Sequence, residues 1–160
     1  MSDKLAKFED IVRRAQNYTD KGEEDVSILH PFEKYDIHEA FPDKVKALFD
    51  NGHYSESAFE AFKFLGHVVR SLASETKDGK ALMLAVFNPQ NPLIALNSLT
   101  STSDQDEQEG YRFLFAGSIL AVRNPRAHEY GLMDTPDKCL DHLILASLLL
   151  RRLEEAGYTV

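Results

Sequence analysis

Apolar residues recur at spacings of three and four along most of this 160-residue chain, which is the pattern of amphipathic helices. The first such segment runs from Asp3 to about Tyr18, and a charged linker from Thr19 to Ser27 follows it. A turn-rich passage then continues to about Phe41. The pattern predicts an all-α protein, with an N-terminal helix and linker in residues 1–27 and a helical domain in residues 28–160.

Three helices are predicted in the first half of that domain. Pro42 suits the first position of a helix that stops near Asn51-Gly52, and Ser55 can cap the next helix, which continues past Val69. After the turn at Asp78-Gly79, the apolar run in residues 81–87 predicts a short buried helix. The leucines and isoleucine of residues 93–99 are expected to close one end of the core.

Two longer helices follow. Ser103 or Asp104 can cap the first of them, which is apolar on nearly every side in residues 111–122 and should therefore run through the centre of the bundle. Thr135 as cap and Pro136 at the first helical position begin the last helix, which continues to about residue 156. Its leucines exceed what one core contact requires, so the helix either forms a homodimer seam or lies between two layers of its own bundle.

The candidate site is the segment in which the apolar helix gives way to Arg123, Asn124, Arg126 and His128. Because Asn124 precedes a proline, it is biased out of helical conformation. The helix should therefore break there, leaving His128 on a bend that can fold back toward Arg123. Guanidinium matches phosphate geometry and imidazole transfers protons near neutral pH, so the segment indicates phosphodiester chemistry. On these six residues alone, a surface loop with a helix-capping cation is an equal alternative.

The pattern R-N-x3-H resembles the signature of the HEPN superfamily of small helical proteins, many of which are metal-independent ribonucleases. Longer segments look like the Ymh family of HEPN-like proteins, and this resemblance covers roughly Ile28 to Gly157. The segments are NGHYSESAFEAFKFLGHVVRSL, DGKALMLAVFNPQNPLIALNSL, DQDEQEGYRFLFAGSILAVRNPRAHEY and LILASLLLRRLEEAG. The resemblance implies a HEPN-like helical bundle with short accessory helices.

The resemblance also implies an activity, namely endoribonucleolytic cleavage by attack of the ribose 2′-hydroxyl, in a toxin or anti-phage defence setting. His128 would transfer a proton, Arg123 would stabilise charge on the phosphoryl oxygens, and Asn124 would orient one of them. Arg126 is assigned to phosphate binding. Tyr130 extends the motif to R-x4-H-x-Y, as in the toxin half of HEPN and nucleotidyltransferase pairs, in which the tyrosine can be modified to silence the toxin. Tyr130 is assigned to substrate binding, but packing beneath the loop is favoured over a functional role.

Family members usually pair two motifs across a homodimer, and an antitoxin or other regulatory protein is a possible further partner. The alternative function is a noncatalytic HEPN-fold module that binds RNA or a nucleotide, or assembles with other proteins. A pure binder does not require the imidazole, so the intact motif favours the nuclease.

Composition narrows these hypotheses. A net charge of −8 and a pI near 5.2 exclude nonspecific coating of nucleic acid, so any RNA contact must be focused. His67 and Arg70, three residues apart, either line a groove or, as their spacing favours, form a solvated polar stripe. Scattered histidines and the single Cys139 predict no metal, no cofactor and a reducing cytoplasm. No leader or membrane-spanning run is expected.

Overall fold

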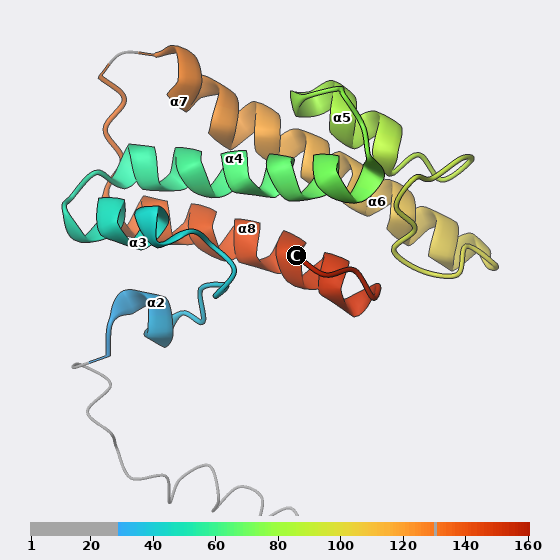
Figure 1. Ribbon diagram of the computed structural model, residues 1–160, viewed down its shortest axis with the longest axis horizontal. Coiled ribbons are helices and arrows are strands. Elements are labelled where there is room, and N and C mark those ends of the chain that lie inside the picture. Colours follow the sequence, from blue (N-terminus) through green and yellow to red (C-terminus); the bar gives the residue numbers. More distant parts are fainter. Residues whose placement is uncertain (1–28, 130) are drawn as a thin grey trace, which may run out of the picture. The chain divides into compact units, whose positions relative to one another are not determined.

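All regular elements in the described part of the chain are helical (Figure 1). The computed structural model describes residues 29–129 and 131–160. The chain divides into two units between Lys34 and Tyr35, and the single-turn helix α2 (Pro31–Lys34) ends the first of them. The prediction of an all-α protein is confirmed, whereas the helix and linker predicted in residues 1–27 lie outside the described residues.

Helix α4 (Tyr54–Ala73) is the central element of the second unit, because it packs against α3 (Asp43–Asp50) on one side and against α8 (Pro136–Glu155) on another. Figure 1 shows α4 and α8 running side by side. The buried face of α4 carries small and large apolar residues, and its inward side chains are Ala58, Ala61, Phe62, Leu65, Val68 and Val69. Burial of this face against several helices contributes to the hydrophobic stabilisation of the unit.

Ser55 does not cap α4, so that prediction was wrong. His53 is the residue before the helix, and Ser55 lies in its first turn with a buried hydroxyl. That hydroxyl donates to the Leu132 carbonyl at 2.7 Å and accepts the Asp134 N–H at 2.9 Å. The serine therefore fastens the segment before α8 to α4, a partnership across nearly 80 residues that local capping rules do not detect.

The connection between α5 (Gly79–Val86) and α6 (Thr102–Ser118) is irregular but firmly attached. The buried side chain of Gln108 accepts the Leu96 N–H at 2.8 Å and donates to the carbonyls of Phe87 and Ile94 at 3.1 and 3.0 Å. Ile94 and Leu96 are buried, so this connection closes one end of the core as the sequence predicted.

Helix α6 begins with a capping box formed by Ser101 and Asp104. The Ser101 hydroxyl accepts the Asp104 N–H at 3.1 Å, and the Asp104 carboxylate accepts N–H groups of Thr100 and Ser101 in return. The cap therefore lies two residues earlier than the predicted Ser103, and Asp104 occupies the third helical position instead of the cap itself.

The capping box predicts an acid-sensitive helix start. Hydrogen bonds from the Ser98 hydroxyl and from Ser101 lower the pKa of Asp104 from its ordinary 3.8 to about 2. A depressed pKa contributes stability above pH 3.8 and loses that contribution as the pH falls toward 2. Asp104→Asn should therefore be less stable than wild type in urea denaturation at pH 6, with the difference disappearing near pH 2. The exposed Asp106→Asn is the control, and an equal deficit at both pH values would contradict the expectation.

Helix α6 does not run through the centre of the bundle, as its apolar character had predicted. Phe113 and Leu114 of α6 are 58% and 48% exposed, and Leu120, in the turn that directly continues α6, is 44% exposed. Phe115 and Ile119 are buried, and Phe115 stacks on Phe87 at the end of α5. This helix is apolar on two faces because one face is part of the core and the other is exposed on the surface. We call Phe113, Leu114 and Leu120 the α6 face.

Helix α8 confirms the predicted start, since Thr135 accepts the Lys138 N–H at 3.3 Å and Pro136 occupies the first helical position. Most of its leucines are buried, but Ile144 and Leu148 are 37% and 48% exposed. Among the described residues, no helix is both long enough and apolar enough to cross a membrane.

Candidate functional site

The segment from Arg123 to His128 continues the helix instead of breaking it. Helix α6 passes into a π-helical turn, η1 (Ile119–Arg123), and then directly into α7 (Asn124–His128). The Asn124 N–H donates to the Ile119 carbonyl, five residues back, and Asn124 keeps helical backbone angles although proline follows it. The predicted break was therefore wrong.

The π turn explains how the helix accepts Pro125. In a regular α-helix the ring of a proline collides with the carbonyl four residues earlier, and its missing N–H leaves that carbonyl without a partner. A turn closed by hydrogen bonds five residues apart is wider and displaces the carbonyls near the ring. Single π turns of this kind occur frequently at functional sites. Both the backbone and the residue types of this segment therefore indicate a functional site.

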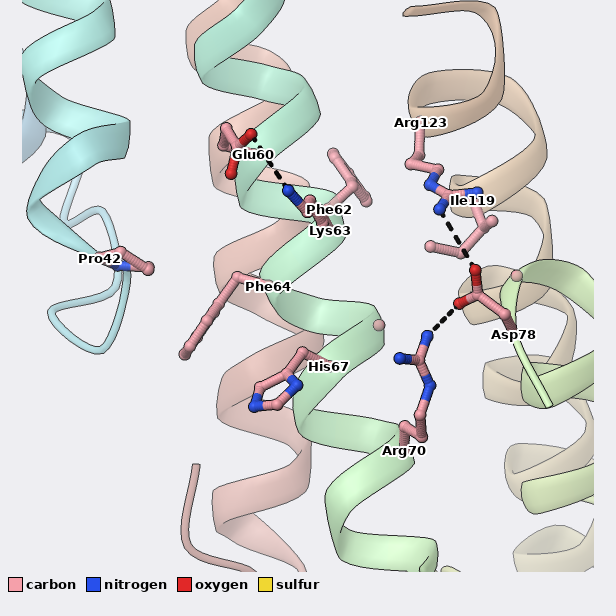
Figure 2. Close-up of a pocket in the computed structure, with 12 residues that line it drawn as sticks. Pro42, Glu60, Phe62, Lys63, Phe64, His67, Arg70, Asp78, Ile119 and Arg123 are labelled. Atoms are coloured by element: carbon pink, nitrogen blue, oxygen red, sulfur yellow. Dashed lines mark hydrogen bonds and ion pairs between the residues drawn. The ribbon is translucent and has the colours of Figure 1, made fainter. Parts of the chain in front are cut away.

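Arg123 projects from η1 toward the loop that precedes α5. Its guanidinium donates to the Asp78 carboxylate at 3.3 Å and to the Asn124 side-chain oxygen at 3.3 Å, and its side chain is 26% exposed. The other oxygen of Asp78 pairs with Arg70 of α4 (Figure 2). One carboxylate thus bridges two guanidiniums contributed by separate helices.

The charge state of Asp78 follows from these neighbours. Partial burial would raise its pKa, but the Gly79 N–H and the positive charges of Arg70 and Arg123 together lower it below the ordinary value. Asp78 is therefore ionised at neutral pH and forms a true ion pair with both guanidiniums.

A cavity of about 400 Å³ opens beside this bridge, across the outer face of α4. We call it the α4 cavity. Polar and charged groups line it together with apolar ones, and Figure 2 shows them along α4 between the start of α3 and η1. The lining residues are Pro42, Glu60, Phe62, Lys63, Phe64, Gly66, His67, Arg70, Asp78, Gly79, Ile119 and Arg123.

His128 lies apart from the α4 cavity. It is the last residue of α7, it is exposed, and Glu129 after it takes extended backbone. It lines a separate open hollow with Arg126, Ala127 and Glu129. The prediction that His128 lies on a bend and folds back toward Arg123 was therefore wrong for a single chain: the continuous helix carries the two side chains to different hollows.

Arg126, which the sequence assigned to phosphate binding, is held inside the protein. Its side chain is 3% exposed and pairs with the fully buried Asp134, with Nε 2.8 Å from Oδ2. It also donates to the Val122 carbonyl at 2.7 Å, and its guanidinium lies 3.1 Å from His142 Nδ1. These contacts leave little of the guanidinium for an external phosphate, and they hold α7 against the segment that leads into α8.

Arg126 affects the pKa of its neighbours Asp134 and His142. Burial would raise the pKa of Asp134, but hydrogen bonds from Lys138 and Arg126 and their charges lower it overall. Burial, followed by the charge of Arg126, lowers the pKa of His142. His142 is thus kept neutral beside the arginine, which suits Nδ1 to accept its hydrogen bond.

Sequence analysis missed part of the site. His67 and Arg70 line a groove, the alternative that their spacing disfavoured, and Lys63 and Asp78 join them there. The His67–Arg70 spacing was the available signal, but only the fold brings the Asp78 loop and Arg123 beside it. Tyr130 is outside the described residues. Within residues 29–129 and 131–160, no group of three or more His, Cys, Asp or Glu side chains is arranged to hold a metal ion.

Residues 35–153 match the model of a protein family described as protein of unknown function (Hypoth_ymh). The chain belongs to the Ymh family. The match starts at the residue where the second structural unit starts, and it contains the α4 cavity, the π turn and His128. Searches of curated proteins and of solved structures gave no match. The Ymh description carries no activity, so function has to be argued from the site.

Proposed function

We propose that this Ymh protein is a metal-independent endoribonuclease with a HEPN-like site formed by Arg123, Asn124 and His128. The observation that carries the proposal is the π turn, which places Arg123 beside a cavity lined by further cationic side chains in a protein of net charge −8. Such local concentration of positive charge is what focused binding of a phosphodiester requires.

The proposed reaction needs only groups of the chain and of the RNA. The ribose 2′-hydroxyl loses its proton to a base, its oxygen bonds to the adjacent phosphorus, and the bond from phosphorus to the 5′-oxygen breaks. The leaving oxygen then takes up a proton. His128 serves one of these two proton transfers, while Arg123 stabilises the charge that develops on the nonbridging oxygens. Asn124, whose side-chain oxygen accepts a hydrogen bond from Arg123, holds the guanidinium in position.

A homodimer resolves the separation of Arg123 from His128 within one chain. The exposed α6 face leads along the same helix to the motif, so a second copy packed on that face with its motif at the same end would bring a second His128 near the first motif. Burial of Phe113, Leu114 and Leu120 would stabilise the contact. The toxin or defence setting, a regulatory partner and a cytoplasmic location remain predictions.

Cleavage of a mixed RNA pool in EDTA tests the proposal. We expect products with a 2′,3′-cyclic phosphate and a 5′-hydroxyl, and no cleavage of a DNA strand of the same sequence, since DNA lacks the attacking hydroxyl. Products with 5′-phosphate ends would contradict the mechanism. RNA that is bound but left intact would favour the noncatalytic binding module, which the separation of Arg123 and His128 in one chain also favours.

A further inference from the structure

We propose that the α4 cavity is a nucleotide-phosphate subsite, in which a phosphate replaces the carboxylate of Asp78 between Arg70 and Arg123. The inference deepens the proposed function, because Arg123 belongs to both, but it also holds for a protein that binds nucleotides without cutting them. Arg70, Lys63 and His67 thereby gain a role that the motif alone does not assign.

The geometry of the bridge between Arg70, Asp78 and Arg123 fits a phosphate site. Each guanidinium reaches one oxygen of the same carboxylate, and the Asp78 side chain is 53% exposed. A half-exposed anion held between two arginines from separate helices occupies the position that a phosphate would take. Phosphate offers more oxygens and more charge to the two donor forks than a carboxylate does. Asp78 therefore competes with a phosphate ligand for the two arginines. In the absence of the ligand, its carboxylate holds both guanidiniums in position.

The charges around the α4 cavity favour an anionic ligand. The α4 cavity is lined by three cations, Lys63, Arg70 and Arg123, against two carboxylates. One of these, Glu60, is already paired with Lys44 at 3.0 Å and with Lys63 at 3.5 Å. Displacing Asp78 leaves both guanidiniums without a counterion, on a protein whose overall charge of −8 would otherwise repel a nucleotide.

The α4 cavity also has the size of a ligand site. About 400 Å³ lies within the range of small-ligand sites, roughly 300–1,000 Å³. Gly66 leaves the floor of the α4 cavity open, since a Cβ there would meet nothing within 4 Å. Figure 2 places Phe64 and His67 on the side of α4 toward Pro42, away from the arginines. Phe64 already packs edge-on against Phe41, with ring centroids 6.0 Å apart, whereas His67 is exposed. With the phosphate at Arg70 and Arg123, the His67 ring is therefore the group on which a base would stack, as in proteins that bind single-stranded nucleic acid.

Calorimetric titration of the full chain tests the subsite with three probes, inorganic phosphate, AMP and a short 2′-O-methyl RNA oligomer that lacks the attacking hydroxyl. Arg70→Gln should weaken binding of the oligomer by about tenfold or more, the effect of one charge-assisted hydrogen bond. Asp78→Asn should strengthen it by a similar factor. Binding of AMP equal to that of the oligomer would identify a free nucleotide as the ligand, and binding of the oligomer alone would identify an RNA strand.

The sign of the Asp78 effect separates this proposal from a structural role. Arg70 also donates from Nε to the Lys77 carbonyl at 3.2 Å, so the cluster fixes the loop before α5. If fixing the loop were its whole purpose, Asp78→Asn would leave binding unchanged or weaken it, and the proposal would be overturned. The matched controls are Arg151→Gln and Asp36→Asn, which remove an exposed arginine–aspartate pair at 2.9 Å away from the cavity.

A steric variant gives an independent test. Gly66→Leu should fill the floor of the α4 cavity and abolish binding of the oligomer, while the melting temperature is kept or raised because glycine disfavours helix interiors. Gly110→Leu is the control, since Gly110 is an exposed glycine of α6 with equally open space. Unchanged binding by Gly66→Leu would overturn the subsite.

These results are independent of catalysis. Cleavage in EDTA without the predicted Asp78 and Gly66 effects would leave the nuclease standing and refute the subsite. The predicted Asp78 and Gly66 effects without any cleavage would support the subsite and refute the nuclease.

Discussion

Replacing His128 with alanine should lower the rate of RNA cleavage in EDTA by about 10²- to 10⁴-fold, the usual contribution of a positioned proton-transfer group. His128 is exposed at the end of α7, so its removal should leave the melting temperature nearly unchanged. Single-turnover rates with a labelled RNA, beside thermal melts of the same preparations, measure both quantities. Arg123→Ala should cause a loss of similar size by removing charge stabilisation at the phosphate.

The matched control is His53→Ala, which removes an exposed imidazole at the start of α4, outside the α4 cavity. It should cleave RNA at the wild-type rate. Retention of full activity by His128→Ala would contradict the assignment of His128 and would point to a contaminating nuclease if the activity also survived Arg123→Ala.

Mixing the two inactive variants distinguishes a site within one chain from a site shared across a dimer. If Arg123 of one subunit acts with His128 of the other, a mixed dimer regains one intact site, and an equal mixture recovers about a quarter of the wild-type sites. If each site instead lies within one chain, the mixture would recover no activity. The separation of the two side chains into different hollows leads us to expect recovery.

The largest effect on stability is expected at Arg126. Arg126→Met should lower the free energy of unfolding by about 3–5 kcal/mol, because it leaves the fully buried Asp134 with only the half-exposed Lys138 as a partner, at 3.0 Å. Urea denaturation at neutral pH measures this loss. Arg151→Met, at an exposed pair with Asp36, should change stability by about 1 kcal/mol or less.

The double variant Arg126→Met, Asp134→Leu tests why Arg126→Met loses stability. If the loss comes from an uncompensated buried charge, removing that charge should recover most of the stability. A double variant as unstable as Arg126→Met alone would show instead that the guanidinium acts through its hydrogen bond to the Val122 carbonyl and its packing.

Sequence reasoning succeeded where a feature depends on neighbouring residues. Thr135 and Pro136 begin α8 through contacts within one turn, so composition alone located that start. Likewise, the helical spacing of apolar residues was sufficient for the all-α fold.

The wrong predictions for Ser55 and Arg126 share a different cause, since each depends on a partner that the sequence does not place. Ser55 has the features of a cap, but the segment at Leu132 and Asp134 takes its hydroxyl. Arg126 has the features of a phosphate ligand, but Asp134 folds back onto it. The α4 cavity combines residues from α4, the loop before α5, η1 and the start of α3 at Pro42, and the His67–Arg70 spacing signals only the part on α4.

The π turn also sets the direction in which every later side chain of the helix points. One extra residue within a helix turns all later side chains by about 100° relative to an uninterrupted helix. Without that offset, Pro125 instead of Arg126 would point in the direction of Asp134, and the bond that holds α7 to the α8 segment would be lost. The spacing of the motif is therefore meaningful only together with the irregular turn before it: the same six residues on a regular helix would face a different part of the molecule.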